Sequence, residues 1–232
     1  GIADTVFSKA SGRSELQLDC EAVPAAIADA GLKPSDVDGL VTFTAESSSE
    51  IHIARNVGIG DLTFFSRVGY GGGAAAGTVA HAAAAIHSGL ADVVVCWRSF
   101  NERSGERYGL GQANRPMDTN ADRAAYSWMT PFGLSTPAQW VAMFAQRYMY
   151  EYGATSEDFG RISVLSRARA ATNPKAHFHG RPITLEEHQA SRWIAEPLHL
   201  LDCCQETDGG QALVLVSAER AKDLPNKPAY VV

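Results

Sequence analysis

The chain has 232 residues, a formal net charge of -6 and 45% hydrophobic residues. It is long enough to bury a sizeable core, and its charge gives no reason to expect nucleic acid as a partner. Its apolar runs are too short to cross a bilayer, and no signal-peptide pattern opens the chain. We therefore expect a cytoplasmic protein without a membrane partner.

The cysteines and histidines do not form a recognisable metal motif. The sequence has four cysteines, at Cys20, Cys96, Cys203 and Cys204. They lack the paired spacing of a zinc site, so we expect free thiols in a reducing compartment. His177 and His179 are two residues apart, but no convincing third ligand accompanies them, and a polar loop is the favoured interpretation. We therefore predict no metal site.

Strands and helices alternate over the first hundred residues. Ser14 and Gln17 fit a capping box at the start of a helix that Gly31 ends, although Pro24 lies inside it. Further strands are predicted at 37–43, 62–68 and 91–97, and helices at 50–57 and from about 73 to 87. This alternation is typical of a parallel or mixed α/β sheet with right-handed crossovers.

The most informative stretch is a run of glycines at the join between a predicted strand and a predicted helix. The strand at 62–68 stops just before Gly71, Gly72 and Gly73, and an alanine-rich run follows. A glycine turn at a helix N-terminus presents free N–H groups and partial positive charge, which suit an anion or a developing oxyanion. The alternative is that small residues merely let buried helices pack closely, and both explanations can hold together.

The pattern changes after residue 100. Residues 101–131 carry scattered polar and aromatic residues without clear periodicity, so we expect a long functional loop there. The remaining segments are predicted as follows: helices from 136 to 152, from 155 to about 168, from 184 onward and at 217–221, and strands at 212–216 and 228–232.

Five stretches together resemble the thiolase superfamily, and within it the sterol-carrier or lipid-transfer type. They are residues 32–40, 88–95, 130–140, 200–204 and 208–210. The resemblance implies an α/β thiolase-like fold whose N-terminal βαβαβαββ half carries an inserted loop domain. It further implies a first part of the core at 1–100, the loop domain at 101–197 and a return to the core at 198–232. The second half of that fold is absent from this chain.

The resemblance also places the thiolase nucleophile. Thiolases carry their reactive cysteine at the start of the buried helix, and that position corresponds to Gly72 here. Glycine cannot form an acyl-enzyme, so ordinary thiolase chemistry is disfavoured. Residues 67–73 and 100–105 look most like the thiolase-like aldolases of bacterial steroid side-chain degradation, which lack this cysteine.

Those aldolases cleave a β-hydroxyacyl-CoA into a ketone and a short acyl-CoA such as propionyl-CoA. They need no cofactor beyond the CoA of the substrate, and they work with a partner protein that carries an OB-fold and a zinc-binding element. By this resemblance, the backbone of Gly72 and Gly73 would hold the enolate oxygen. In the resembling aldolases, tyrosines of the second half are implicated as the base. Tyr70 is the nearby tyrosine in this chain and thus a candidate base, although an aromatic wall of the acyl pocket is the favoured interpretation.

The resemblance further implies that the loop domain holds CoA. Arg123 and Lys175 could meet its phosphates, and Ser127 and Met129 could line the same groove, although such surface cations are often simply solvated. Trp128, Met129 and Phe132 could line a sterol-sized cavity or just pack the loop domain. Family members pair through the third strand, so residues 62–68 and the following helix are expected near a homodimer interface. A non-catalytic, lipid-binding or acyl-CoA-binding scaffold is the alternative function, and an acyltransferase is the least favoured.

Overall fold

The computed structural model describes residues 1–43, 46–69, 71–105, 107 and 120–231, without the side chains of residues 71, 120–123 and 125. The chain divides into two compact units. Unit 1 contains Gly1–Gly105 and Thr207–Val232, and unit 2 contains Glu106–Glu206. Each unit has its own helices and strands, and each is described separately.

Unit 1 is built on a mixed β-sheet. In the described part of the chain the sheet has five strands in the order β1-β7-β4-β2-β3. Strands β4, β2 and β3 are parallel, while β7 is antiparallel to both β4 and β1. In chain order its elements are β1 (Ile2–Asp4), α1 (Glu15–Asp29), η1 (Pro34–Asp36), β2 (Gly39–Phe43), α2 (Glu50–Val57), β3 (Phe64–Val68), η2 (Gly71–Gly73), α3 (Ala74–His87), β4 (Val93–Asn101), β7 (Asp208–Val216) and α8 (Ala218–Ala221). This is the expected βαβαβαββ order, with unit 2 inserted between β4 and β7.

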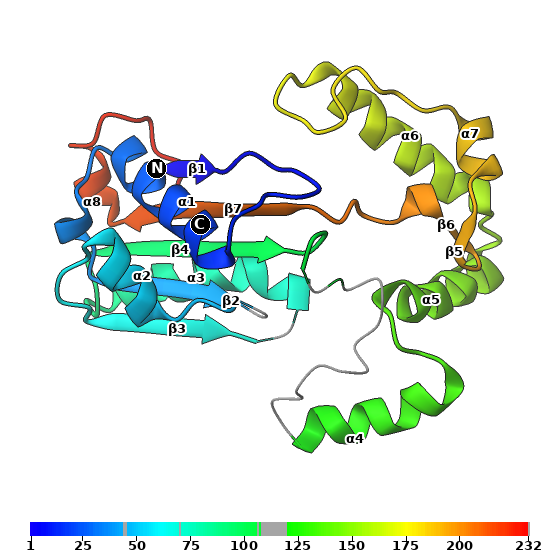
Figure 1. Ribbon diagram of the computed structural model, residues 1–232, viewed down its shortest axis with the longest axis horizontal. Helices are drawn as coiled ribbons and strands as arrows, with labels where there is room; N and C mark the ends of the chain where they lie inside the picture. Colours follow the sequence, from blue (N-terminus) through cyan, green and yellow to red (C-terminus); the bar gives the residue numbers. More distant parts are fainter. Residues whose placement is uncertain (44–45, 70, 106, 108–119, 232) are drawn as a thin grey trace. The chain divides into compact units, whose positions relative to one another are not determined.

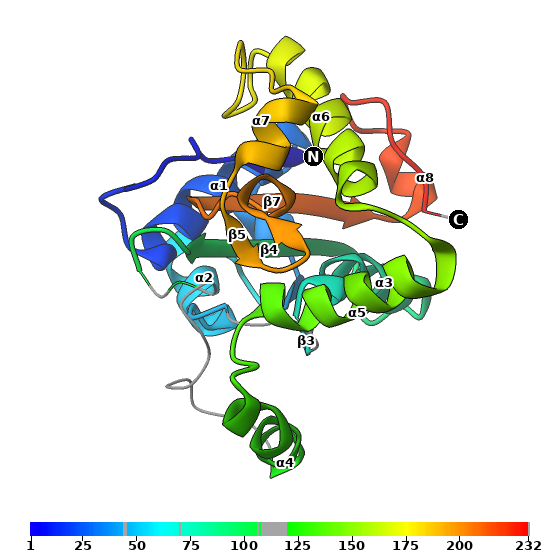
Figure 2. The same cartoon turned by 90° about the vertical axis from the view of Figure 1, so that its right-hand side faces the viewer.

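Helices cover both faces of this sheet (Figures 1 and 2). Helices α1 and α2 pack on one face against Val93, Val95 and Trp97 of β4. Helix α3 packs on the other face against Val94 and Cys96 of the same strand. Burial on both faces explains why β4 has the nearly continuous apolar sequence of a central parallel strand.

The helix boundaries follow the local sequence signals. Ser14 and Gln17 form the predicted capping box of α1, and Gly31 follows the helix with a φ of 73°. Gly58 ends α2 in the left-handed conformation with a φ of 85°. A glycine adopts such a conformation without the steric cost of a β-carbon, so these two glycines terminate their helices.

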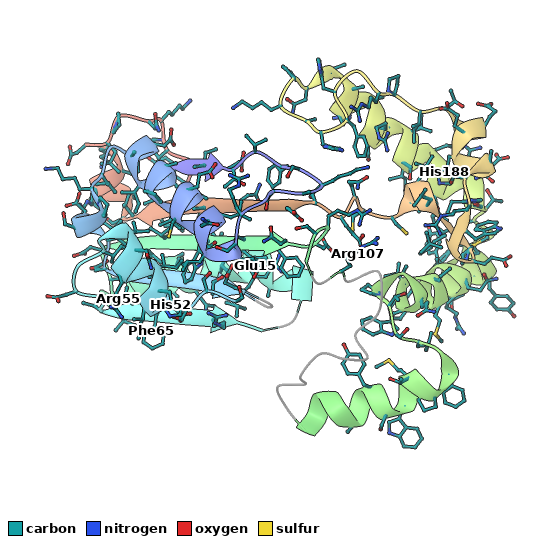
Figure 3. The ribbon with its side chains drawn as sticks, viewed as in Figure 1. Glu15, His52, Arg55, Phe65, Arg107 and His188 are labelled. Carbon is teal, nitrogen blue, oxygen red and sulfur yellow. The ribbon has the colours of Figure 1, made fainter. Side chains whose placement is uncertain are left out.

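Unit 2 is mainly helical. Its elements are α4 (Asn120–Met129), η4 (Thr130–Phe132), α5 (Pro137–Tyr152), α6 (Ser156–Thr172), α7 (Leu185–Ala190), β5 (Trp193–Ala195), β6 (Leu198–His199) and η5 (Leu200–Asp202). Three of the helices begin where they were predicted, and the structure shows capping boxes at Thr136, Thr155 and Thr184. Near the two ends of the unit, Arg107, which is labelled in Figure 3, donates a 2.6 Å hydrogen bond from Nε to Glu206.

A buried histidine organises the interior of unit 2. His188 is 0% exposed, and its Nε2 lies 2.7 Å from the Asp202 carboxylate. The same carboxylate accepts hydrogen bonds from Ser163 Oγ and from the backbone N–H of His199. Asp202 therefore links α6, α7 and the β5–β6 hairpin.

Two sequence predictions about secondary structure were wrong. Residues 120–129 form helix α4 within the stretch expected to be irregular, because its alanines favour a helix more than its scattered polar residues suggested. The remainder of that stretch, 106 and 108–119, lies outside the described residues. Residues 228–231 do not form the predicted strand. The sheet edge beside β7 is already occupied by β1, and Pro228 has no N–H to donate.

Candidate functional site

The candidate site lies at the carboxyl edge of β2, β3 and β4, where α3 begins (Figure 1). Strand β3 ends at Val68, and the glycine turn η2 leads directly into α3 at Ala74. Gly73 is the N-cap residue and has helical backbone angles, φ -64° and ψ -24°. A glycine brings no side chain that could accept from the first-turn amides. These N–H groups and the helix dipole therefore favour negative charge at this edge.

The glycines of this segment do not share one structural role. A β-carbon on Gly77 would lie 3.2 Å from Cγ1 of Val68, so this position needs a small residue for packing. A β-carbon on Gly72 or Gly73 would meet no described heavy atom within 4 Å beyond its chain neighbours. Close packing thus explains Gly77, but it does not explain Gly72 and Gly73.

The strand that leads into the glycine turn is anchored by Arg67. Its guanidinium donates to the carbonyl oxygens of Glu46 and Ser48 and forms a 3.2 Å ion pair with Glu50. The Glu46 carboxylate in turn accepts from the N–H groups of Ser48 at 2.7 Å and Ser99 at 2.8 Å. These contacts join β3, β4 and the connection after β2. Tyr70, the candidate base, lies outside the described residues.

Acidic side chains gather on the α1 face of the same edge. Asp19 is 1% exposed, and neither of its carboxylate oxygens accepts a hydrogen bond by distance and angle among the described residues. Burial, and next the charge of Glu46, raise the pKa of Asp19 to about 7, although the Ser48 and Ser99 hydroxyls favour its charged form. Burial also raises the pKa of Glu46 against the opposing effect of its N–H donors. Glu15 accepts from the N–H of Asn101 at 3.0 Å.

Asp208 binds the segment that leaves the sheet. Its carboxylate accepts hydrogen bonds from the N–H groups of Ser11, Arg103 and Ser104 and from Ser104 Oγ. Burial acts to raise the pKa of Asp208, but these hydrogen bonds outweigh it and the pKa is lowered. A β-carbon on the following Gly209 would lie 2.3 Å from the Phe7 ring. In this Asp-Gly-Gly stretch, Asp208 therefore anchors the neighbouring backbone, and Gly209 allows the Phe7 ring to pack closely.

The predicted CoA-binding residues are all in unit 2. Ser127 and Met129 lie on α4, as does the backbone of Arg123, whose side chain is outside the described residues. Ser127 Oγ donates to the carbonyl of Ala124, and Lys175 is exposed between α6 and α7. Among the described side chains, no hydrogen bond joins Lys175 to Ser127 or Met129. This set therefore stays a prediction.

Sequence reasoning missed three charged residues at the carboxyl edge of unit 1, namely Asp19, Glu46 and Arg98. Arg98 follows the apolar run 93–97 of β4, and its guanidinium carbon lies 4.8 Å from the Phe43 ring centroid. An arginine next to such a run was a usable signal. Asp19 was harder to find, because an acidic residue in an amphipathic helix is usually solvated.

The described residues contain no cluster of three or more His, Cys, Asp or Glu side chains arranged to bind a metal ion. Among the same residues, no helix is both long and apolar enough to cross a membrane.

Several curated relatives match the whole chain, among them an aldolase and a lyase. It is 76% identical over 231 residues to a steroid side-chain-cleaving aldolase of Thermomonospora curvata, covering 100% of this chain and 59% of that protein. It is 59% identical over 231 residues to a 17-hydroxy-3-oxo-4-pregnene-20-carboxyl-CoA lyase of Mycobacterium tuberculosis, covering 100% of this chain and 60% of that protein. The chain therefore spans about three fifths of the length of these two relatives.

The fold and the family model agree with these relatives. A solved structure of an Ltp2-ChsH2(DUF35) aldolase superposes with a TM-score of 0.89 at 73% identity, covering 97% of this chain and 56% of that one. Residues 4–219 match the family described as thiolase, N-terminal domain. The α/β fold predicted from the resemblance is thus confirmed, and the chain belongs to the thiolase family, with residues 4–219 as its N-terminal domain.

Proposed function

We propose that this chain is part of a carbon–carbon lyase that cleaves a steroid side-chain β-hydroxyacyl-CoA by a retro-aldol reaction. The products are a ketone and a short acyl-CoA such as propionyl-CoA. Two observations together carry the proposal. The chain is 76% and 59% identical, over its whole length, to two lyases of this type, and a β-carbon at Gly72 would meet no described heavy atom within 4 Å beyond its chain neighbours.

The proposed chemistry needs no covalent intermediate. A base removes the proton of the β-hydroxyl group, and the bond between the α- and β-carbons breaks. The electron pair of that bond forms the thioester enolate, which is then protonated on carbon to give the shortened acyl-CoA. N–H groups at Gly72 and Gly73 donate to the enolate oxygen, an interaction that typically contributes about a hundredfold or more in rate.

Further parts of the proposal are the remaining site residues, the cofactor and the cellular compartment. Tyr70 stays the candidate base, and Arg123, Ser127, Met129 and Lys175 the candidate CoA-binding residues. CoA enters as part of the substrate, and no further cofactor is required. The reaction would take place in the cytoplasm.

We further propose a homodimer and a second protein partner. The β3 strand lies at the sheet edge, and Phe65 on it is 67% exposed and projects outward (Figure 3). An exposed strand edge with an apolar side chain favours pairing with another chain. The similar solved aldolase is an Ltp2-ChsH2(DUF35) assembly, which supports a partner of the kind with an OB-fold and a zinc-binding element.

Acyl transfer through a cysteine is not supported. Cys96 is buried on β4, and burial raises the pKa of its thiol to about 12. Burial also raises the pKa of Cys203, with a further contribution from Asp202. Neither thiol is activated as a thiolate nucleophile. The second candidate function is a non-catalytic acyl-CoA-binding scaffold, in which glycine at position 72 reflects the loss of thiolase activity.

The deciding experiment is an assay of the purified protein together with its partner. A β-hydroxyacyl-CoA that bears a steroid ring system is incubated, and mass spectrometry follows the ketone and the shortened acyl-CoA. Formation of both products without an acyl-enzyme adduct supports the lyase. Tight binding of the ester without cleavage contradicts it and supports the scaffold.

A further inference from the structure

Arg98 lies on the same face of the sheet as α3. Side chains alternate between the two faces along a strand, so Cys96, Arg98 and Phe100 of β4 point to one face, and Trp97 and Ser99 to the other. Cys96 Sγ contacts the carbonyl of Thr78 on α3 at 3.5 Å, and Ser99 Oγ donates to the carbonyl of Glu15 on α1. Arg98 is therefore on the α3 side.

Two aromatic rings position the guanidinium. Its carbon lies 4.8 Å from the ring centroid of Phe43 on β2 and 4.9 Å from that of Phe100. Both distances are within the range of a cation–π interaction. Because Phe100 is two residues nearer the carboxyl end of β4, the guanidinium extends toward that edge of the sheet. The two rings also reduce the number of conformations open to this long side chain.

The guanidinium lies at the level where α3 begins. Helix α3 connects the parallel strands β3 and β4, so it runs opposite to them, and its N-terminus is at their carboxyl edge. From the Cys96–Thr78 contact, Arg98 is two strand residues, about 6.6 Å, further toward this edge. Ala74 is four helix residues, about 6 Å, further in the same direction. Arg98 and the residue that follows Gly73 therefore stand at the same height.

Charge is distributed unequally between the two faces of this edge. Glu15, Asp19 and Glu46 lie on the α1 side. Arg98 lies on the α3 side, together with the positive end of the helix dipole. An anionic oxygen is thus favoured on the α3 side. On the α1 side the carboxyls share the edge with the Arg67 guanidinium, and burial raises the pKa of Asp19 and of Glu46.

We propose that Arg98 is a further residue of the lyase reaction, supplying a fixed positive charge to the thioester enolate oxygen. This inference rests on the proposed function. When the bond between the α- and β-carbons breaks, its electron pair becomes the enolate, and Arg98 stabilises the resulting charge without giving up a proton. A guanidinium stays protonated in proteins and offers five N–H donors, so it can serve the enolate beside other acceptors. The backbone amides at Gly72 and Gly73 act on the same oxygen.

The first test compares the kinetics of three variants in the complete complex. Arg98→Met keeps an unbranched side chain between the rings but removes the charge, and Arg98→Lys keeps the charge without the planar fork. We expect kcat to fall about a hundredfold in Arg98→Met with a small change in KM, and less in Arg98→Lys. Arg55→Met, on the exposed surface of α2, is the matched control and should leave kcat unchanged (Figure 3).

The second test does not depend on turnover. Calorimetry compares two CoA thioethers as probes, one that ends in a carboxylate in place of the enolate and one that ends in a neutral methyl ketone. The wild type should bind the carboxylate probe more tightly, and Arg98→Met should lose this preference by about tenfold or more. Arg98→Gln is a second neutral variant, should Arg98→Met fold poorly.

The two tests separate the two proposals. If Arg98→Met and Arg98→Gln keep the preference for the carboxylate probe, or if the wild type has none, the inference about Arg98 is overturned, whether or not the steroid ester is cleaved. If the preference depends on Arg98 and the wild type does not cleave the ester, the proposed lyase function fails while Arg98 stands as an anion-binding residue.

Discussion

Gly77 on α3 and Val68 on β3 lie so close together that a β-carbon on the glycine would be 3.2 Å from Cγ1 of the valine. Five residues earlier, in η2, the same addition at Gly72 meets no described heavy atom within 4 Å beyond its chain neighbours. We therefore expect opposite consequences of one substitution at the two positions. Gly77→Val should lower the free energy of unfolding by about 1–3 kcal/mol through overpacking. The folded variant should keep its turnover, because the substitution leaves Gly72 and Gly73 unchanged.

Gly72→Val should fold with nearly wild-type stability but lose turnover by about tenfold or more, because its side chain occupies the space proposed for the reacting thioester. Urea denaturation and the mass-spectrometric cleavage assay measure the two effects, with each variant as control for the other. Unchanged turnover in Gly72→Val, or a loss of stability equal to that of Gly77→Val, would contradict the role given to this space.

Asp19 gives unit 1 a pH-dependent stability. Its pKa in the folded chain is raised from 3.8 to about 7, so the folded state binds the proton more tightly than the unfolded state. The contribution of Asp19 to the free energy of unfolding should therefore be fully present below about pH 4 and be lost as the pH rises through about 7. Asp19→Asn should remove most of this pH-dependent change in the free energy of unfolding, which is on the order of a few kcal/mol, and should stabilise the chain at pH 8.

Urea denaturation at pH 5 and at pH 8 measures this effect. Asp61→Asn, at an exposed position before β3, is the control and should leave the pH dependence unchanged. A pH dependence that persists in Asp19→Asn would show that another group, with Glu46 as the first candidate, carries the proton linkage.

Much of unit 1 could be predicted because its signals are local. The capping box at Ser14, the left-handed glycine at Gly31 and the apolar run of β4 each depend on neighbouring residues. The β5–β6 hairpin and β1 were not predicted, since strands of two or three residues carry almost no periodicity. The missing strand at 228–231 shows the same limit, because whether it pairs depends on which strand already occupies the edge.

The candidate site was predicted only in part. Gly72 and Gly73 were singled out because a glycine turn before a helix has a direct electrostatic meaning, and their role stays a prediction. Arg98, Asp19 and Glu46 were not found, because their significance depends on which sheet face each one points to. The position of Arg98 directly after an apolar run was a usable signal, but the face on which each residue lies follows only from how β4 packs against α1 and α3.

Asp208 is expected to be a major stability determinant of unit 1. Its carboxylate accepts hydrogen bonds from three backbone N–H groups and from Ser104 Oγ. Asp208→Ala should lower the free energy of unfolding by about 3 kcal/mol or more, since four part-buried donor groups lose a charged acceptor. Because the folded pKa is lowered, the stabilisation is present above the unfolded pKa and is lost as the pH falls through the folded value.

Thermal and urea denaturation of Asp208→Ala test this, with Asp4→Ala as the control. Asp4 accepts one exposed hydrogen bond from Gln211 on the neighbouring strand, so its loss should cost less than about 1 kcal/mol. Equal effects of the two substitutions would rule out a special role for Asp208.

For Gly160 on α6, packing and helix propensity predict opposite effects of an alanine substitution on the stability of unit 2. Alanine in a helix interior is more favourable than glycine by about 1 kcal/mol, so propensity alone predicts that Gly160→Ala stabilises unit 2. A β-carbon there would lie 2.7 Å from Nδ1 of the fully buried His188 and 2.7 Å from Cδ1 of Leu185. His188 cannot move without lengthening its 2.7 Å hydrogen bond to Asp202. We therefore expect Gly160→Ala to destabilise unit 2 by about 1–3 kcal/mol.

Urea denaturation measures the effect, and Ser166→Ala, at an exposed position of the same helix, should be neutral or slightly stabilising. A stabilised Gly160→Ala variant would mean that α6 and α7 can separate slightly without cost, and that the His188–Asp202 contact does not fix their distance.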